Sequence, residues 1–247
     1  MLAFTRLSLV LSGESVHTPR PYPHPISVLD VDAPVAGEDF QQLNDAMDVA
    51  SEYNERTTTL AKYLSLYHVF ENFMFKSPLV ELERKSGGGM FSIRDFRRLY
   101  REVEKSELSV LKRLFKEVFP TTATPTSSFR QVVEGRWTSF CPAPQIPDLD
   151  RLLMRLGITK GQSSLAYADF AGHESAGYFA QIVYSVRNVI VHNTETEWHL
   201  TSKSLDEAAC LLLEDFLMPS MEEIGFSLMA TKNPLVWYNN PAISLYY

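Results

Sequence analysis

The sequence has 247 residues and a mass of 28.1 kDa; 45% of its residues are apolar, 21% are charged, and its mean hydropathy is −0.12. These values exclude a collagen-like, coiled-coil or wholly disordered chain and indicate a soluble protein with a sizeable core. The 23 Lys and Arg residues against 30 Asp and Glu residues give a net charge of −7, which excludes a general nucleic-acid coat protein.

Cysteine usage and hydropathy indicate a cytoplasmic protein. Cys141 and Cys210 are too few for a disulfide framework, so we expect a reducing compartment. No run of about 18 apolar residues exists, so we expect no membrane-spanning helix. The N-terminus resembles a signal peptide only weakly, because its apolar core is short and no small-residue cleavage site follows it cleanly.

Prolines and glycines divide the N-terminal third of the chain. Residues 1–37 hold a cluster of prolines and predict an irregular arm with one short strand around residues 4–11. Residues 38–77 contain neither Gly nor Pro and favour helix. We expect this helical run to break in two near residues 54–59, where β-branched and polar residues gather.

Residues 90–119, which follow a Gly-rich connection and end before Pro120, predict one long helix with a basic face. At helical spacing the apolar residues gather on one side and the basic residues on the other. This basic ridge consists of Arg94, Arg98, Arg101, Lys105, Lys112 and Lys116, with Arg97 near its edge. It indicates a surface that contacts RNA phosphates without reading sequence. Ordinary solvation beside Glu102 and Glu104 explains the same pattern.

The C-terminal half continues the helical pattern. A short amphipathic segment is expected around residues 129–137, and a short helix over residues 146–156. Residues 178–218 form the longest run without Gly or Pro and predict two helices separated by a polar break. The second of these is expected to start at Leu205, with Ser204 as the cap of a capping box.

Long helical patterns dominate and strands are scarce, so the predicted fold class is all-α. We expect one helical domain over residues 38–230. The Pro-rich arm precedes it, and an aromatic tail over residues 231–247, broken by prolines, follows it in an extended conformation.

Motifs of several common chemistries are absent from the sequence. It has no GxxxxGK[ST] or GxGxxG loop for phosphates and no GxSxG elbow for a serine nucleophile. It also lacks HExxH, CxxC and any pair of histidines at helical spacing, which zinc sites commonly use. We therefore expect neither a metal nor a cofactor.

Three polar residues, Arg187, Asn188 and His192, interrupt an otherwise apolar helical segment. Because a buried charge is costly unless paired, Arg187 either points out of the core or lies at a contact surface. On a helix, Asn188 and His192 share a face with Tyr184, whereas Arg187 lies about 140° around the axis from His192. Arg187 and His192 converge only if the helix ends between them or if two copies of the chain pool their residues.

This segment resembles the R-x4–6-H motif of the HEPN superfamily in its R-N-x-x-x-H form, with Arg187, Asn188 and His192 at the motif positions. The resemblance rests on this segment and on the all-α layout from residue 38 to about residue 230. It implies a helical bundle that dimerises with the two motifs facing each other. It also implies the metal-independent endoribonuclease activity of many bacterial and archaeal toxins and abortive-infection effectors. The arm and the tail match nothing in that family.

The residue types suit cleavage of RNA by attack of the ribose 2′-OH on its own phosphate. His192 would move a proton at neutral pH, and Arg187 would stabilise the charge of the transition state. Asn188 would orient His192 or hold a phosphate oxygen, and Tyr184 is a supporting residue on the same face. By analogy with helical HEPN-like bundles, Glu71 would steer Arg187; an exposed glutamate on a polar face explains Glu71 equally well.

Three functions therefore stay open. The first is a cytoplasmic, homodimeric endoribonuclease of antiviral defence or toxicity, with RNA as substrate and an inhibitory or sensor protein as a further partner, and with no membrane association. The alternative is a non-catalytic HEPN-like module that binds nucleotides or nucleic acid or mediates dimerisation. The third is a plain helical scaffold, in which Arg187 pairs with a carboxylate and His192 caps a helix end.

Overall fold

The computed structural model describes residues 2–12, 19–24, 38, 40–86, 92–94, 97, 105–191 and 198–240. These residues are mostly helical, as the sequence predicts. The α-helices are α1 (Leu2–Leu11), α2 (Asn44–Glu55), α3 (Thr59–Ser86), α5 (Glu107–Val118), α6 (Phe129–Phe140), α7 (Ile146–Arg155), α8 (Ser175–Val191), α9 (Glu207–Cys210) and α10 (Met218–Ala230). A π-helix, η5 (Leu211–Leu217), joins α9 to α10 without a break.

Short elements connect the helices. The 3-10 helices are η1 (Phe40–Leu43), η2 (Ala143–Gln145), η3 (Tyr167–Asp169) and η4 (Gly172–Glu174). Two antiparallel strand pairs are described: β1 (Thr122–Thr124) with β2 (Ser127–Ser128), and β3 (Thr159–Lys160) with β4 (Ser163–Ser164). Both pairs are turns between helices rather than a sheet layer, which is consistent with the all-α prediction.

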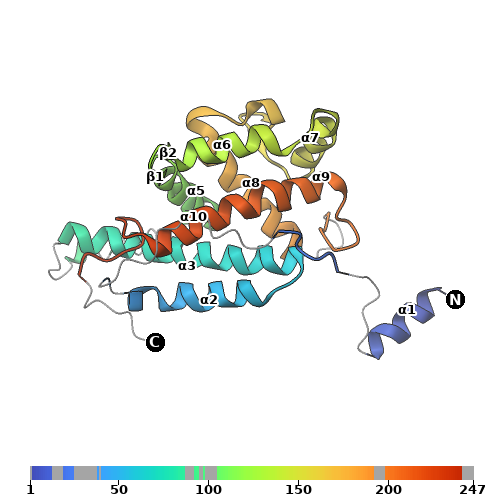
Figure 1. Ribbon diagram of the computed structural model, residues 1–247, viewed down its shortest axis with the longest axis horizontal. Helices are drawn as coiled ribbons and strands as arrows, with labels where there is room; N and C mark the ends of the chain where they lie inside the picture. Colours follow the sequence, from blue (N-terminus) through green and yellow to red (C-terminus); the bar gives the residue numbers. More distant parts are fainter. Residues whose placement is uncertain are drawn as a thin grey trace.

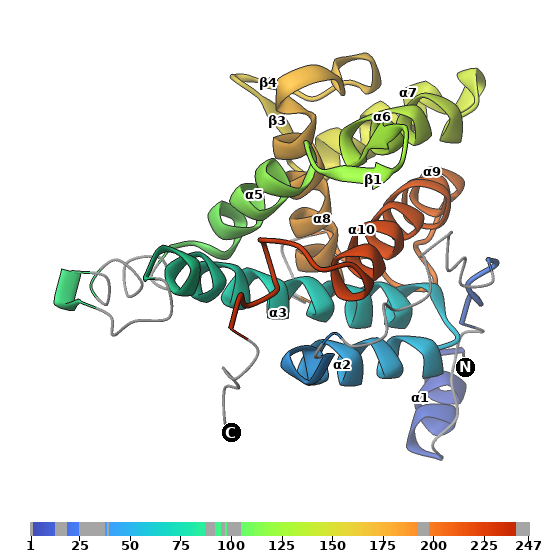
Figure 2. The same ribbon diagram turned by 60° about the vertical axis from the view of Figure 1, so that its left-hand side comes forward.

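The helices form layers around α3 and α10 (Figure 1). α3 is the longest helix, with α2 antiparallel beneath it and η5–α10 above it, and α6 and α7 form the outer layer on the other side. α8 descends from the β3–β4 turn to α3, packing chiefly against α5 (Figure 2). The C-terminal end of α8, which carries Arg187, is thereby brought against the middle of α3.

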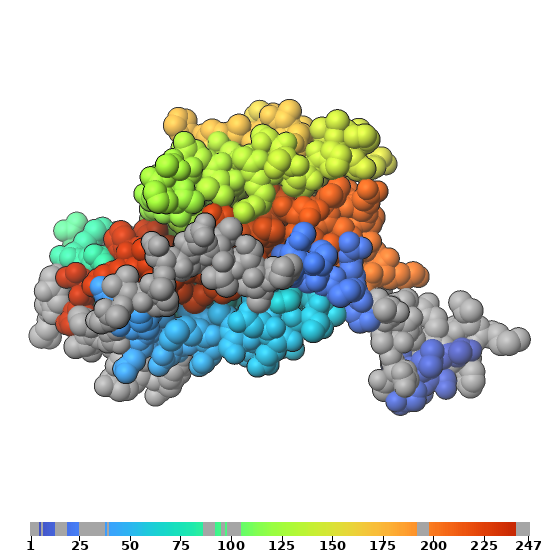
Figure 3. Space-filling view, viewed as in Figure 1, coloured from blue at the N-terminus to red at the C-terminus, as the bar shows by residue number. Residues whose placement is uncertain are grey.

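The break between α2 and α3 falls at residues 56–58, where the sequence predicts it. The N-terminal arm stabilises this break: the Tyr22 N–H donates to the Thr57 carbonyl over 3.0 Å, and the Thr59 N–H donates to the Arg20 carbonyl over 3.1 Å. Figure 3 shows residues 19–24 on the surface between α3 and the η5–α10 layer. Residues 19–24 of the arm are therefore docked on the bundle.

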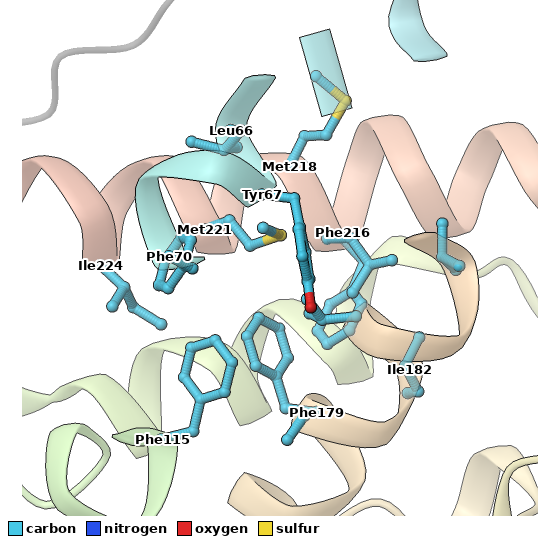
Figure 4. Close-up of a cluster of buried hydrophobic side chains, with 14 of the residues drawn as sticks. Leu66, Tyr67, Phe70, Phe115, Phe179, Ile182, Phe216, Met218, Met221 and Ile224 are labelled. Carbon is cyan, nitrogen blue, oxygen red and sulfur yellow. The ribbon is translucent and has the colours of Figure 1, made fainter. Parts of the chain in front are cut away.

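The core is built largely from aromatic side chains. Phe179 on α8 lies 4.8 Å from Phe115 on α5 and 5.7 Å from Phe216 on η5, measured between ring centroids. Figure 4 shows this cluster closed by α3 and α10, which contribute Phe70 and Met221. Since each aromatic ring buries a large apolar area, these contacts fix α8 relative to α3.

The strand predicted around residues 4–11 is wrong, because the chain forms helix α1 there. Leu and Ala favour helix, and a helix satisfies its own backbone hydrogen bonds, whereas a lone strand needs a partner. α1 lies apart from the bundle in Figure 1, and Leu7, Val10 and Leu11 are exposed on it.

The prediction of one helix over residues 90–119 is also wrong. α5 begins only at Glu107; Lys105 lies in a bend, and Ser106 occupies the N-cap position. Ser is common at this position and Glu107 suits the first turn beside the helix dipole, although the Ser106 side chain makes no capping hydrogen bond. The basic ridge therefore does not follow a single helix.

Two smaller predictions also change. The helix expected at Leu205 begins two residues later, at Glu207, because the Asp206 carboxylate rather than the Ser204 hydroxyl accepts a first-turn N–H. The tail is not simply extended: its described part turns back on the bundle and buries Trp237 completely. The short helix expected over residues 146–156 is confirmed as α7, and the amphipathic segment around residues 129–137 forms helix α6.

Among the described helices, none combines the length and apolar character needed to cross a membrane.

Candidate functional site

Arg187 lies on helix α8 directly after the last buried residue of the helix. Phe179, Ile182, Val183 and Val186 repeat at helical spacing and are all buried against α5 and α3. Arg187 follows the last of them, and its side chain is 22% exposed. The guanidinium therefore lies at the edge of the core, where an unpaired charge would be costly.

A buried tyrosine of α3 holds the turn of α8 from which Arg187 projects. The Tyr63 hydroxyl donates to the Val183 carbonyl over 2.6 Å, and Tyr63 is completely buried. Burial raises the pKa of Tyr63 well above its ordinary value, so this hydroxyl remains a donor at physiological pH. Val183 lies one turn before Arg187, so this contact fixes the height of the arginine along α3.

Side chains of Tyr67, Glu71 and Asn188 lie around the Arg187 guanidinium. Glu71 on α3 lies 3.7 Å from it, between Nη2 and Oε1. The Tyr67 ring lies 5.7 Å from the guanidinium carbon, within the range of a cation–π contact. Nη1 donates to Oδ1 of the neighbouring Asn188 over 3.2 Å. The structure thus brings together Arg187, Asn188 and Glu71, three residues that sequence reasoning singles out.

A second carboxylate lies beside Glu71. The Tyr67 hydroxyl donates to Oε1 of Glu107 over 2.6 Å, and Glu107 stands at the first turn of α5. Burial raises the pKa of Glu71 above its ordinary value, Glu107 raises it further, and His68 and Arg187 oppose the shift. The carboxylates of Glu71 and Glu107 therefore lie together in a half-buried site. Arg187 pairs with Glu71, and the Tyr67 hydroxyl donates to Glu107.

A pocket of about 290 Å³ opens next to this group, between α3 and the start of α5, and we call it the α3–α5 pocket. Its α3 wall consists of Glu71, Met74, Phe75 and Pro78, which repeat at helical spacing. Glu107 and Val110 form its α5 wall, and Lys105 also lines it. Glu71 contacts Arg187 and also lines the pocket, so this glutamate links the arginine to the pocket wall.

The other proposed site residues are distributed as follows. Tyr184 on α8 is half-buried and packs against the core. His192 lies outside the described residues, directly after Val191, the last residue of α8. The chain is described again from Trp198, and the Leu200 N–H donates to the Val189 carbonyl over 2.8 Å. The chain therefore leaves α8 beside Arg187 and returns to the same helix end.

The predicted basic ridge is only partly described. Lys112 and Lys116 lie one turn apart on α5, half-buried and exposed respectively. Arg94, Arg97 and Lys105 are exposed and precede that helix. Arg98 and Arg101 lie outside the described residues. Lys112 and Lys116 thus share a face of α5. The other three described members of the ridge align with them only in the helical pattern of the sequence.

Sequence reasoning missed Glu107, Phe75 and the role of Tyr67. The signal for Glu107 was present, since a Ser followed by Glu is typical of a helix start. Tyr67 precedes Glu71 by one helical turn, so the two side chains share a face. Phe75 carries no sequence signal of its own, because an exposed and a buried phenylalanine look the same in an apolar helix.

No group of three or more His, Cys, Asp or Glu side chains with metal-binding geometry occurs among the described residues. Cys141 and Cys210 are free thiols, and both are buried. Against protein-family models, curated proteins and solved structures, the chain finds no match.

Proposed function

We propose that this protein is a metal-independent endoribonuclease of the HEPN type that cleaves RNA at a composite Arg/His site across a homodimer. The observation that carries the proposal is the setting of Arg187: a 22% exposed guanidinium, 3.7 Å from Glu71, which also lines the α3–α5 pocket. Preorganised cations of this kind stabilise negative charge that develops in a transition state.

In this mechanism the ribose 2′-oxygen attacks its own phosphorus and the bond to the 5′-oxygen of the next nucleotide breaks. The 2′-OH proton goes to a base, and the leaving oxygen receives a proton from an acid. An imidazole with a pKa near neutrality can serve in either role, which is the part assigned to His192. The fork of N–H donors on Arg187 suits the phosphoryl oxygens.

A homodimer supplies both an acid and a base, because each copy brings one His192 and one Arg187. The C-terminal end of α8 suits this arrangement, since Val191 at its last position is 46% exposed. Glu71 acts as a positioning residue in this scheme: its carboxylate and the Tyr67 ring hold the guanidinium. We extend the proposal to a cytoplasmic role in antiviral defence or toxicity, on the resemblance of the motif alone.

The decisive experiment is cleavage of a single-stranded RNA by the purified protein in excess EDTA. Arg187→Ala and His192→Ala should each abolish cleavage while the oligomeric state in size-exclusion chromatography stays unchanged. Arg151→Ala is a matched control, because Arg151 is an exposed arginine that pairs with Asp148 on its own helix. Cleavage that persists in both motif variants would overturn the site assignment.

The alternative function is a non-catalytic module that binds RNA or nucleotides at the same residues. The α3–α5 pocket favours it as a second candidate, because a pocket beside an arginine can bind a phosphorylated ligand without turnover. In that case RNA binding, measured by fluorescence anisotropy, should fall in Arg187→Ala while no cleavage products form with the wild type.

A further inference from the structure

The α3–α5 pocket combines an apolar wall with two carboxylates, which is an unusual surface to leave open. Met74, Pro78 and Val110 supply apolar lining, and Glu71 and Glu107 supply the acceptors. Its volume of about 290 Å³ lies near the lower end of the range for small-molecule sites, which is about 300–1,000 Å³. A compact ligand that is flat and apolar on its faces and rich in hydrogen-bond donors at its edge fits this lining.

Phe75 provides a face for such a ligand. It lines the pocket and is 64% exposed, although its neighbours one turn away on α3 are buried or half-buried. Exposing a large aromatic side chain forfeits the free energy of burying it. In proteins that bind single-stranded nucleic acid, exposed aromatic rings are the surfaces on which bases stack.

The carboxylates select the edge of the ligand. A carboxylate accepts hydrogen bonds and donates none, so the ligand must present donors to Glu71 or Glu107. Among the four RNA bases, only guanine presents two adjacent N–H donors, N1–H and N2–H, which match the two oxygens of one carboxylate. The Tyr67 hydroxyl, 2.6 Å from Oε1 of Glu107, holds that carboxylate in place.

Positive charge beside the α3–α5 pocket orients a bound nucleotide. Arg187 lies 3.7 Å from Glu71, so a phosphate at Arg187 would be followed directly by a ribose and a base at the pocket. Lys105 also lines the pocket and adds positive charge for the sugar–phosphate backbone of the RNA. A nucleotide therefore meets cations at its phosphate and acceptors at its base edge.

We propose that the α3–α5 pocket binds a guanine base of the RNA, stacked on Phe75 and hydrogen bonded to Glu107, beside the phosphate held by Arg187. This inference rests on the proposed function in taking RNA as the ligand, and it adds base preference to a reaction that the motif alone leaves without one. Glu107 and Phe75 are specificity residues in this scheme.

The test is equilibrium binding of the four nucleoside 3′-monophosphates to the full chain at pH 7, measured by isothermal titration calorimetry in EDTA. Guanosine 3′-monophosphate should bind at least about tenfold more tightly than the other three, as expected for one bidentate contact. Phe75→Ala should weaken binding of all four by about tenfold, because stacking does not depend on the base. Glu107→Gln should remove the preference for guanine and leave the remaining affinities unchanged.

Met154→Ala is the matched control, since Met154 is a 57% exposed apolar residue on α7. Circular dichroism establishes that each variant is folded. Equal binding of the four nucleotides by the wild type, or unchanged binding in Phe75→Ala, would overturn the inference.

The same nucleotides separate this inference from the proposed function. Guanine-selective binding that depends on Phe75, in a protein that cuts no RNA, supports the pocket and refutes the nuclease. RNA cleavage without preference for positions next to guanine supports the nuclease and refutes the pocket.

Discussion

Glu214, buried in the π-helix η5, accepts two hydrogen bonds from the Arg20 guanidinium at 2.8 and 2.9 Å, across 194 positions of sequence. The Thr59 hydroxyl donates to the same carboxylate over 2.6 Å. The Glu214 side chain is 3% exposed and that of Arg20 is 47% exposed. A buried carboxylate thus depends on the N-terminal arm for its counter-charge.

Removing that counter-charge should loosen the arm. In Arg20→Ala the free energy of unfolding should fall by about 1–2 kcal/mol, less than for a fully buried pair because Arg20 is half exposed. The amide of Thr59, which donates to the Arg20 carbonyl, should exchange faster with deuterium. Urea unfolding and hydrogen exchange measure the two effects.

The control for this prediction is Arg56→Ala. Arg56 pairs with Glu52 one turn away, and both side chains are more than half exposed. Its loss should cost less than about 0.5 kcal/mol, as for other exposed pairs. If Arg20→Ala costs no more than this control, the arm does not contribute to the stability of the bundle.

Lys76 should make stability rise at alkaline pH. It is 8% exposed; its ammonium donates to the Gln42 carbonyl, and burial lowers its pKa to about 8 from an ordinary value of 10.5. Between those two values the unfolded chain binds the proton more tightly than the folded one, so stability increases as pH rises through this window. Below pH 8 the folded protein carries a buried charge.

Lys76→Met should therefore have a higher free energy of unfolding than the wild type at pH 7. This difference should disappear by pH 10.5. The difference in unfolding free energy between the two proteins should change by up to about 3 kcal/mol across the window. Urea unfolding at the two pH values measures it. Lys85→Met, which removes an exposed lysine paired with Glu81 on the same helix, should show no such change. Parallel pH profiles for Lys76→Met and the wild type would refute the prediction.

Local patterns were enough to predict much of the fold. The break between α2 and α3, the short helix α7 and the long approach to Arg187 all follow from Pro and Gly positions and from helical periodicity. The start of α5 was missed because the helix begins at Glu107 inside a run with no Gly or Pro. Composition identifies helical residues there but not where one helix ends and the next begins.

Contacts between distant segments were not predictable. The pairing of Arg20 with Glu214 and the approach of Glu107 to Glu71 depend on how whole helices pack. Helical periodicity in the sequence does not predict this packing. Glu71 could be named beside Arg187 only by analogy with the HEPN superfamily, because a glutamate on a helix is more often solvated than paired.

The C-terminal tail should contribute strongly to stability. Trp237 is completely buried, lies 5.1 Å from the Phe40 ring, and donates its indole N–H to the Leu228 carbonyl over 2.9 Å. Trp237→Ala should cost about 3–5 kcal/mol through the cavity it leaves. Trp237→Phe should cost less because it keeps a ring. If Trp237→Ala lowers the free energy of unfolding no more than Met154→Ala, a substitution at an exposed residue, the tail is dispensable for stability.

Glu71→Gln should separate positioning of Arg187 from stability. The glutamine keeps the shape of the side chain but removes the charge 3.7 Å from the guanidinium, so we expect RNA cleavage to fall by about tenfold, as small misplacements of catalytic groups cause. Stability should not fall. The raised pKa of Glu71 means that the folded protein loses stability as pH rises above the ordinary value of 4.5, and the glutamine removes this loss.

Initial cleavage rates and urea unfolding at pH 7 measure the two effects of Glu71→Gln side by side. Glu81→Gln is the control, since Glu81 lies on the same helix and pairs with Lys85 away from the site. A merely structural role for Glu71 would lower rate and stability together, whereas a positioning role lowers the rate alone and mainly through kcat. An unchanged rate would show that Glu71 does not position Arg187 for cleavage and that the contacts with Tyr67 and Asn188 suffice.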